Sequence, residues 1–432
     1  MIQIALLLLG GDFLRSRAKY LWLMGVLWSI TGCVIFLDGL DGAPLFPLKT
    51  FGALLLLESL VTLSIASSGI GAQKAVLYFK GGIFLFVAVS MLLNHQYSNM
   101  LLAFFFSATY AIVGLFILAS AWVVRFPYWR TTCITGVLYL AFALFLVMHP
   151  HSAVSFFLGG MIVSSSVNML IVAKRLHGLK WTTSVFELML PVDFFTARPA
   201  KEEPEAGAMP QPAAAGPLNV HVWTPEGSAK GSTLPRPVIN RYIAAVDVNG
   251  VISTGHAALE ASPLVYISLY PAQDIDRSPS EFLRLLKATH DNDVPGIFQP
   301  DYITESTRWC ASDRKITFRD YNLKGLLHFW QRYQQDMTYN LTYRNCSSST
   351  AYALESALDG VLSARTRSWH AMVKMLFMPE LWIAAQVRQR ATTMAWTPGL
   401  VMDYARALNA IVHPVPRPWY QRMPWGQRAQ KP

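Results

Sequence analysis

Six apolar runs, each about as long as the hydrocarbon core of a bilayer is thick, constrain the first half of the chain. An α-helix needs roughly 20 residues to cross that core. The runs cover residues 20–40, 46–67, 73–93, 99–123, 130–148 and 152–173. Short polar segments join them, which is typical of an up-and-down helical bundle. Residues 1–190 are therefore predicted to form an all-α, six-helix transmembrane domain with the lipid bilayer as its partner.

Composition and charge agree with a membrane protein. Hydrophobic residues make up 53% of the chain and charged residues 14%, whereas about 25% of a typical soluble domain is charged. The net charge of +10 comes from the first 190 residues and from the tail, residues 414–432. The region between them is close to neutral, so the basic stripe that a nucleic-acid partner requires is not expected. The aromatic and basic tail suits either headgroup contact or a disordered end.

The distribution of Lys and Arg predicts the orientation of the helices, because loops that carry them stay in the cytoplasm. Basic residues flank the first, second, fourth and sixth runs on one side, whereas the opposite loops hold only Lys49. We therefore expect a multi-pass protein of a bacterial-type inner (plasma) membrane, with both termini and the C-terminal domain in the cytoplasm. The N-terminal MIQIALLLLGGDF lacks the basic start and cleavage site of a signal peptide, which predicts an amphipathic or interfacial segment.

Two ionisable residues fall inside apolar runs. Glu58 lies near the middle of the second run and Lys80 about two turns into the third. Charges within a bilayer are usually paired or functional. No helices broken by Gly or Pro accompany them, so a structural ion pair between Glu58 and Lys80 is favoured over a transport site.

The membrane half also resembles a known family. The resemblance rests on the hairpin-like helices, on Gly-rich segments such as KGGIFLFVAV, and on HPHSAVSFFLGGMIV before the last helix. Over residues 20–175 the chain is similar to the HdeD family of small six-helix inner-membrane proteins associated with acid and stress resistance. The resemblance implies a role in the stress response. A homo-oligomer formed through the membrane domain is left open.

The character of the chain changes after residue 190. Residues 191–217 are rich in Pro, Ala, Gly and Glu, which predicts a linker that lets a separate domain move below the membrane. Residues 218–413 are long enough to bury a core of their own. Strands are expected at NVHVW, RYIAAVDV, VISTGHAALE, LVYISLYP and RKITF, and Asn249-Gly250 is typical of a hairpin turn.

Helices are expected to follow, which makes the domain α+β. A capping box of Ser278 and Glu281 begins the first of them. The expected helices cover residues 278–290, 323–338, 346–359, 369–388 and 398–411.

Cys346 begins one of these helices. Asn345 is a good N-cap, and Ser347 to Ser349 fill the first turn. A thiol at this position experiences the positive end of the helix dipole, which lowers its pKa toward that of a reactive thiolate. The free backbone N–H groups of the first turn could also hold an oxyanion. Cys346 is therefore the candidate nucleophile.

His256 is the candidate base. It shares one face of the strand 251–260 with Ala258 and Glu260, because side chains alternate along a strand. A hairpin that turns around Ser262 places Ser268 opposite His256, where it could fix the imidazole tautomer. A register shifted by two residues would place Tyr266 or Tyr270 there instead.

Other chemistries have weaker signals. Cys310 lacks a helix-start position and is expected to be structural, and in a reducing cytoplasm a Cys310–Cys346 disulfide is not expected. The chain has no Cys-x-x-Cys zinc signature and no glycine-rich phosphate-binding motif. We therefore expect neither a metal nor a cofactor.

The C-terminal domain resembles circularly permuted papain-like enzymes of the NlpC type, which include peptidases and lipid acyltransferases. The resemblance covers about residues 240–360 and rests on STGHAALE, on the following YISLYP, and on YNLTYRNCSSSTAYALE. In such enzymes the His lies on a strand, a polar third residue lies on the next strand, and the Cys begins a helix. His256, Ser268 and Cys346 match those places, although Ser268 departs from the usual His, Asn or Gln.

One main hypothesis results: a membrane-anchored, cysteine-dependent hydrolase in stress response or protein quality control. Cys346 attacks an acyl or peptide carbonyl, His256 moves the proton, and water resolves the thioester. Peptide hydrolysis is favoured. The alternatives are a lipid or acyl transferase or a thioesterase of the same fold, and a catalytically silent membrane scaffold that binds peptides or lipids.

Overall fold

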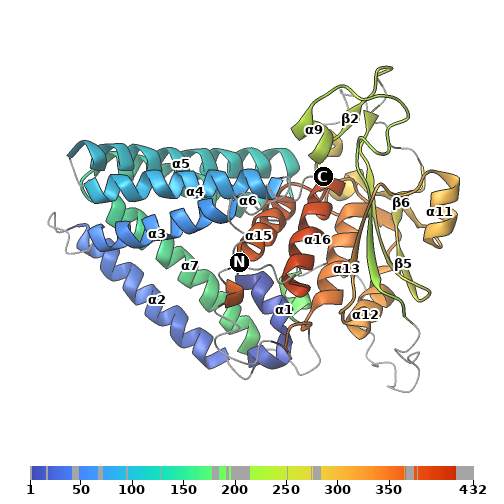
Figure 1. The fold of residues 1–432 in the computed structure, drawn as a ribbon, viewed down its shortest axis with the longest axis horizontal. Coiled ribbons are helices and arrows are strands. Elements are labelled where there is room, and N and C mark those ends of the chain that lie inside the picture. Colours follow the sequence, from blue (N-terminus) through green and yellow to red (C-terminus); the bar gives the residue numbers. More distant parts are fainter. Residues whose placement is uncertain are drawn as a thin grey trace, which may run out of the picture. The chain divides into compact units, whose positions relative to one another are not determined.

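The computed structural model divides the chain into two compact units. One unit, here the α+β unit, contains Met1–Arg15, Val123–Pro127 and Leu179–Pro414, and the other, here the helical unit, contains Ser16–Trp122 and Tyr128–Gly178. Figure 1 labels their helices and strands along the chain. The residues that the structure describes are 2–15, 18–40, 48–66, 72–93, 96–126, 128–177, 184–190, 194–195, 215–250, 252–273, 275, 284–363, 365, 374–376 and 378–414.

The helical unit consists of apolar helices that coincide with the six predicted runs. Their bounds are α2 Ala18–Asp38, α3 Leu48–Ala66, α4 Ala72–Leu93, α5 Gln96–Val124, α6 Trp129–Met148 and α7 Ala153–His177. Within the described part of the chain, α2, α5, α6 and α7 are long and apolar enough to cross a membrane. The helices α3 and α4, which carry Glu58 and Lys80, are not in this group. The described apolar part of α4, Leu77–Leu93, is shorter than the four spans.

Glycines set the packing of α2 against α7. Gly25, Gly32 and Gly39 recur every seven residues on the side of α2 that meets α7. A Cβ added at Gly32 would lie only 2.9 Å from the backbone nitrogen of Val163. Small residues let helix backbones approach closely, which is how helices associate where water supplies no driving force.

The α+β unit is built on a four-stranded antiparallel sheet with the order β5-β4-β1-β8. The strands are β1 Leu218–Trp223, β4 His256–Ala261, β5 Val265–Ile267 and β8 Arg314–Phe318. One face is apolar and includes the fully buried Val220, Val222 and Leu259. The helices α13 (Cys346–Leu358) and α16 (Pro398–Val412) pack against the strands on this side (Figure 1). The alternation of side chains therefore sends His256 to the other face.

Shorter elements complete the unit. They are the sheets β2 Ala245–Val246 with β3 Ile252–Ser253 and β6 Leu269–Pro271 with β7 Val294–Phe298 and β9 Thr338–Tyr339, the 3₁₀ turn η2 His290–Asn292, and the helices α8 Val185–Met189, α9 Pro237–Tyr242, α11 Tyr302–Arg308, α12 Leu323–Tyr333 and α15 Pro379–Thr393. The expected α+β class is confirmed by these strands and helices. As expected, Asn249-Gly250 joins two strands, β2 and β3, and Gly250 has the positive φ of 79° that such a turn requires.

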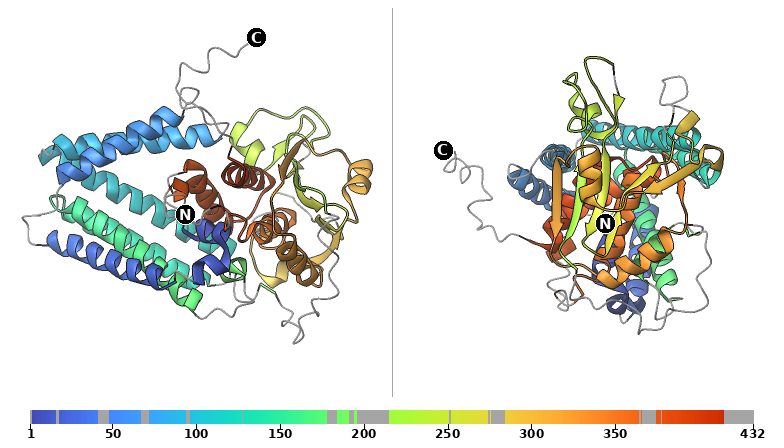
Figure 2. Two further views of the ribbon diagram at one scale, coloured as in Figure 1. Left: turned by 60° about the horizontal axis from the view of Figure 1, so that its bottom comes forward. Right: turned by 90° about the vertical axis from the view of Figure 1, so that its right-hand side faces the viewer.

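The N-terminal segment corrects a prediction. Helix α1 (Ile2–Arg15) belongs to the α+β unit, and its Leu7 and Leu8 are fully buried there. The backbone N–H of Gly360 donates to the carbonyl of Leu7 at 2.9 Å, and Leu362 donates to Leu8 at 2.8 Å. Figures 1 and 2 show α1 beside the red helix α15. An apolar run without a polar face is a core helix, so the expected interfacial segment and its place in a 1–190 membrane domain are wrong.

Helix α8 likewise belongs to the α+β unit, ahead of the predicted boundary at residue 190. Its Phe186 is buried and its backbone N–H donates to Asp359 at 3.1 Å. The predicted linker, residues 191–217, lies mostly outside the described residues, as do the capping box Ser278 and Glu281 and the tail 414–432 beyond residue 414. Of the predicted helix 369–388, residues 374–376 are described as helical, and α15 then begins at Pro379, which occupies a first-turn position.

The burial of α1 leads to a stability prediction. Leu8→Ala is expected to lower the free energy of unfolding of the α+β unit by about 2–5 kcal/mol, because it leaves a cavity in a packed core. The matched change Ile303→Ala, at a residue of the same unit that is 76% exposed, should alter it by less than about 0.5 kcal/mol. Hydrogen exchange of the β1 and β4 amides in the full chain measures both, and equal effects would contradict the placement of α1.

Candidate active site

The first turn of α13 is fixed by its N-cap. The side chain of Asn345 accepts a hydrogen bond from the backbone N–H of Ser348 at 2.8 Å, and the Asn345 N–H donates to the Ser348 hydroxyl at 2.8 Å. The Asn345 amide also donates to the carbonyls of Leu341 and Trp396. Asn345 is thus the helix cap that its sequence position predicts. This capping box fixes the position of Cys346 at the positive end of the helix.

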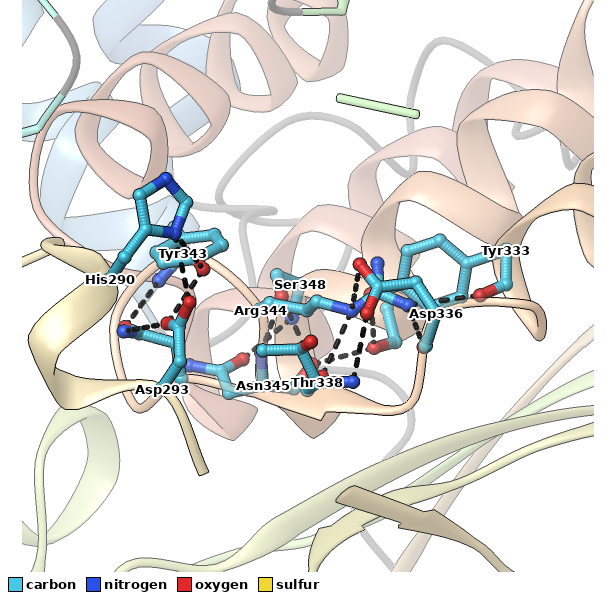
Figure 3. A network of polar contacts seen from close by, with 11 residues as sticks. His290, Asp293, Tyr333, Asp336, Thr338, Tyr343, Arg344, Asn345 and Ser348 are labelled. Carbon is cyan, nitrogen blue, oxygen red and sulfur yellow. Dashed lines mark hydrogen bonds and ion pairs between the residues drawn. The ribbon is translucent and has the colours of Figure 1, made fainter. Parts of the chain in front are cut away.

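The chain that leads into this turn is also held by a polar network (Figure 3). The buried Arg344 donates to the carbonyls of Tyr333 and Thr338, each at 2.9 Å, and its guanidinium lies 3.8 Å from the centre of the Tyr333 ring. On the other side, Asp293 accepts hydrogen bonds from the Tyr343 hydroxyl and the Asn340 amide. Both ends of the segment before Cys346 are therefore tied to neighbouring elements.

His256 is the first residue of β4 and is buried. The preceding Gly255 has a φ of 72°, and a Cβ there would collide with the Trp223 carbonyl, so only glycine fits. The imidazole stacks on the ring of Tyr270, with centroids 4.1 Å apart. Trp223 packs beside it at 5.3 Å. These contacts leave the imidazole little freedom to rotate.

A carboxylate that the sequence did not indicate lies next to His256. Glu305 on α11 is only 3% exposed, and its Oε1 lies 3.3 Å from the His256 Nε2. It accepts hydrogen bonds from the Tyr270 hydroxyl at 2.7 Å and the Tyr266 hydroxyl at 2.5 Å. A carboxylate on a short helix has no sequence motif. The one available signal was Asp301, which caps α11 through Thr304.

Ser268 also reaches the imidazole, although through a different register from the predicted one. Its hydroxyl lies 2.8 Å from the His256 Nε2. The hairpin pairs Leu259 with Ile267 and Glu260 with Tyr266, which is a shift of two residues from the predicted pairing. The turn centres on Pro263 instead of Ser262, so Ser268 falls between β5 and β6 rather than opposite His256.

Two polar contacts of His256 occupy one of its two ring nitrogens, Nε2. Nε2 faces the Ser268 hydroxyl and the Glu305 carboxylate, which leaves Nδ1 for the thiol of Cys346. Burial alone raises the pKa of that thiol, but the positive charge of His256 and its hydrogen bond, together with hydrogen bonds from Ser347 and the Ala257 backbone, outweigh burial and lower it. A thiolate beside an imidazolium is the activated form of a cysteine nucleophile.

Cys310 lacks this environment. Burial raises the pKa of its thiol, and the nearby Asp313 and Glu305 raise it further. Its carbonyl accepts a hydrogen bond from the Trp223 indole at 2.8 Å. All four cysteines of the chain are free thiols. Cys310 therefore offers a control thiol within the same unit.

The predicted intramembrane pair is a separate feature of the helical unit. The Lys80 ammonium lies 2.6 Å from the Glu58 carboxylate and links α4 to α3. The Thr62 hydroxyl donates to the same carboxylate oxygen at 3.1 Å. Pairing of this kind offsets the cost of placing charges among apolar helices.

No metal site accompanies these groups among the described residues, because nowhere in them do three His, Cys, Asp or Glu side chains come together in a way that could hold an ion. Comparison with known proteins found no matching family model, no matching curated protein and no matching solved structure.

The environment of Cys346 leads to a pH prediction. A lowered pKa means that the thiolate is present above that pKa, so alkylation of Cys346 by iodoacetamide should reach half its maximal rate below the ordinary thiol value of about 8.5. His256→Ala removes the two largest lowering interactions and leaves burial opposed only by the hydrogen bonds from Ser347 and the Ala257 backbone, so the midpoint should rise. Mass spectrometry of the alkylated peptides measures this, with Cys310 as the internal control. An unchanged midpoint in His256→Ala would contradict the pairing.

Proposed function

We propose that the protein is a membrane-anchored cysteine hydrolase, with Cys346 as the nucleophile and His256 as the general base. The observation that carries the proposal is the position of the Cys346 thiol at the capped N-terminus of α13, where it interacts with His256 and its pKa is lowered. The imidazole is in turn fixed by the buried Glu305. A nucleophile, a base and a group that orients the base are the three parts of a hydrolytic triad.

The chemistry follows from these positions. The thiolate of Cys346 attacks the substrate carbonyl, and a C–S bond forms as the carbonyl electrons move to oxygen. The backbone N–H groups of the first turn of α13 are placed to stabilise that oxyanion. When the C–N or C–O bond breaks, the His256 imidazolium protonates the leaving group. His256 then removes a proton from water, which attacks the thioester and releases the carboxylic acid and the thiol.

Glu305 is proposed to be the orienting residue of this triad. Its carboxylate accepts two tyrosine hydroxyls, which fixes it in place beside Nε2. A fixed negative charge at Nε2 stabilises the imidazolium that forms when Nδ1 takes a proton. The uncharged hydroxyl of Ser268 hydrogen-bonds to the same nitrogen, as donor or acceptor. The role that the sequence assigned to Ser268 is therefore proposed to be shared, with Glu305 as the stronger member.

The substrate and setting come from the resemblances of the sequence. We favour a peptide substrate over a lipid acyl chain because the domain resembles NlpC-type peptidases, and a role in stress response because the membrane half resembles the HdeD family. The bilayer is proposed to be a bacterial-type inner membrane with the α+β unit in the cytoplasm, in line with the positions of Lys and Arg.

We propose six crossings because six apolar helices are present, and the chain order agrees with this number as it does with four. Segments of the α+β unit occur before α2, between α5 and α6, and after α7. Four helices separate the first two segments and two separate the next pair. An even number of crossings returns the chain to the same side of the membrane each time. With α3 and α4 crossing as the Glu58–Lys80 pair, all six helices satisfy this requirement.

An activity probe tests the proposal directly. A thiol-directed vinyl sulfone peptide probe should label the full chain in nanodiscs at Cys346, and Cys346→Ala should abolish labelling. Cys310→Ala should label like the wild type, because burial and the nearby carboxylates raise the pKa of the Cys310 thiol and disfavour its reactive thiolate. Equal labelling of wild type and Cys346→Ala would exclude this nucleophile and favour the scaffold alternative.

The orienting role has its own test. Glu305→Gln keeps a hydrogen-bond acceptor and removes the charge, so it should lower kcat about tenfold or more with little change in KM. Ser268→Ala should have a smaller effect. Glu260→Gln is the matched control, because Glu260 lies on the same sheet face but hydrogen-bonds His221 at 2.9 Å. A larger loss in Ser268→Ala than in Glu305→Gln would return the orienting role to Ser268.

A further inference from the structure

The segment 228–255, here the arm, carries an apolar face that no described residue of the α+β unit covers. It contains α9 and the two-stranded sheet of β2 and β3. Backbone hydrogen bonds pair Leu234 with Val246, and β2 pairs Val246 with Ile252. Paired residues share a face and alternate residues along a strand return to it, so Leu234, Val246, Val248 and Ile252 all lie on one side.

The side of the arm that carries these residues is exposed to solvent, and the opposite side is buried. Leu234, Val248 and Ile252 are between 41% and 64% exposed. On the opposite face, Ala245 and Asp247 are at most 2% exposed. A strand that buries its polar side chain and exposes its aliphatic ones reverses the usual pattern of a surface strand, which marks the face for another apolar surface.

Helix α9 adds to this apolar surface. Ile239 and Ile243 are one helical turn apart and 42% and 51% exposed. The arm is a folded part of the unit, because the Asn240 amide donates to the Leu234 carbonyl at 2.8 Å. Arg241 and Tyr242 bind Asp403 of α16 at 2.5 and 2.9 Å. The exposed aliphatic residues therefore sit on a fixed support.

The short connection between the α+β unit and helix α7 indicates which surface covers this face. The unit follows α7, an apolar helix long enough to cross a membrane, and only residues 178–184 separate α7 from α8. Seven residues reach at most about 25 Å. The bilayer is thus within constant reach of the unit, which makes it the surface of highest local concentration. The exposed Lys230 and Arg236 supply positive charge in the same segment, which suits anionic headgroups.

We propose that the apolar face of the arm docks into the surface of the bilayer, with Leu234, Val248, Ile252, Ile239 and Ile243 at the boundary between headgroups and acyl chains. Aliphatic residues accompanied by basic ones are the composition of an interfacial contact. Only Thr254 and Gly255 separate β3 from His256. A docked arm holds the strand of the candidate base close to the membrane, which would favour substrates at the lipid surface.

Photo-crosslinking in proteoliposomes tests the docking. A diazirine amino acid placed at Val248 of the full chain, reconstituted in phosphatidylglycerol and phosphatidylethanolamine, should give lipid adducts by mass spectrometry. The same group at Ile303, which is 76% exposed in the same unit, is the control and should give mainly water adducts. Equal lipid labelling at both positions would mean random collision. Water adducts alone at Val248, or a crosslink to a second copy of the chain, would overturn the proposal.

Charge reversal supplies an independent readout. Lys230→Glu and Arg236→Glu should each lower lipid adducts at Val248 by roughly fivefold or more on anionic vesicles, since each basic residue near such a surface contributes about 1 kcal/mol and the new carboxylate adds repulsion. Neutral phosphatidylcholine vesicles should show no such change. Cys346 labelling by the activity probe should persist in both variants, which separates failure of docking from failure of the catalytic assignment. Unchanged adducts on anionic vesicles would contradict the electrostatic part of the docking.

Discussion

The site depends on strand β4, which has an apolar face toward the core and a second face that carries His256. Its apolar residues must lie under α13 and α16, and the period of two then places His256 on the opposite face. Because α13 packs on the same strand, its first turn reaches the end of β4 where His256 begins. The core thus brings together a helix-start thiol and a strand imidazole that lie far apart in sequence. Gly255 makes this possible, because no side chain fits between β4 and the Trp223 carbonyl.

Two buried carboxylates of the α+β unit, Glu305 and Glu355, are each compensated by a cluster of partners. Glu305 is satisfied by two tyrosine hydroxyls and His256, and Glu355 on α13 is paired with Arg388 of α15 at 2.6 Å and with the Tyr404 hydroxyl of α16 at 2.8 Å. The second cluster ties together the helices that support the nucleophile. A buried charge is costly unless it is paired. Such pairing holds α13 in one position, which a catalytic cysteine at its N-terminus requires.

The parts of this architecture that depend on local patterns could be predicted from the sequence. The apolar runs, the helix cap at Asn345 and the strand face of His256 all follow from residue periodicity or capping preference. The pairing register of β4 with β5 did not, because a two-residue shift keeps every side chain on its face and leaves the pattern unchanged. Glu305 was missed because tertiary packing alone brings α11 to the imidazole. Helix α1 was predicted to be interfacial because an apolar run has the same sequence pattern in a protein core as at a membrane surface.

Trapping of an acyl-enzyme tests the central claim most directly. The full chain in nanodiscs is mixed with an activated acyl ester and quenched in acid, and the modified peptide is identified by mass spectrometry. The account predicts an acyl thioester on Cys346 that forms in the wild type and forms much more slowly in His256→Ala. An acyl group found only on other residues, or formed at the same rate without His256, would contradict it.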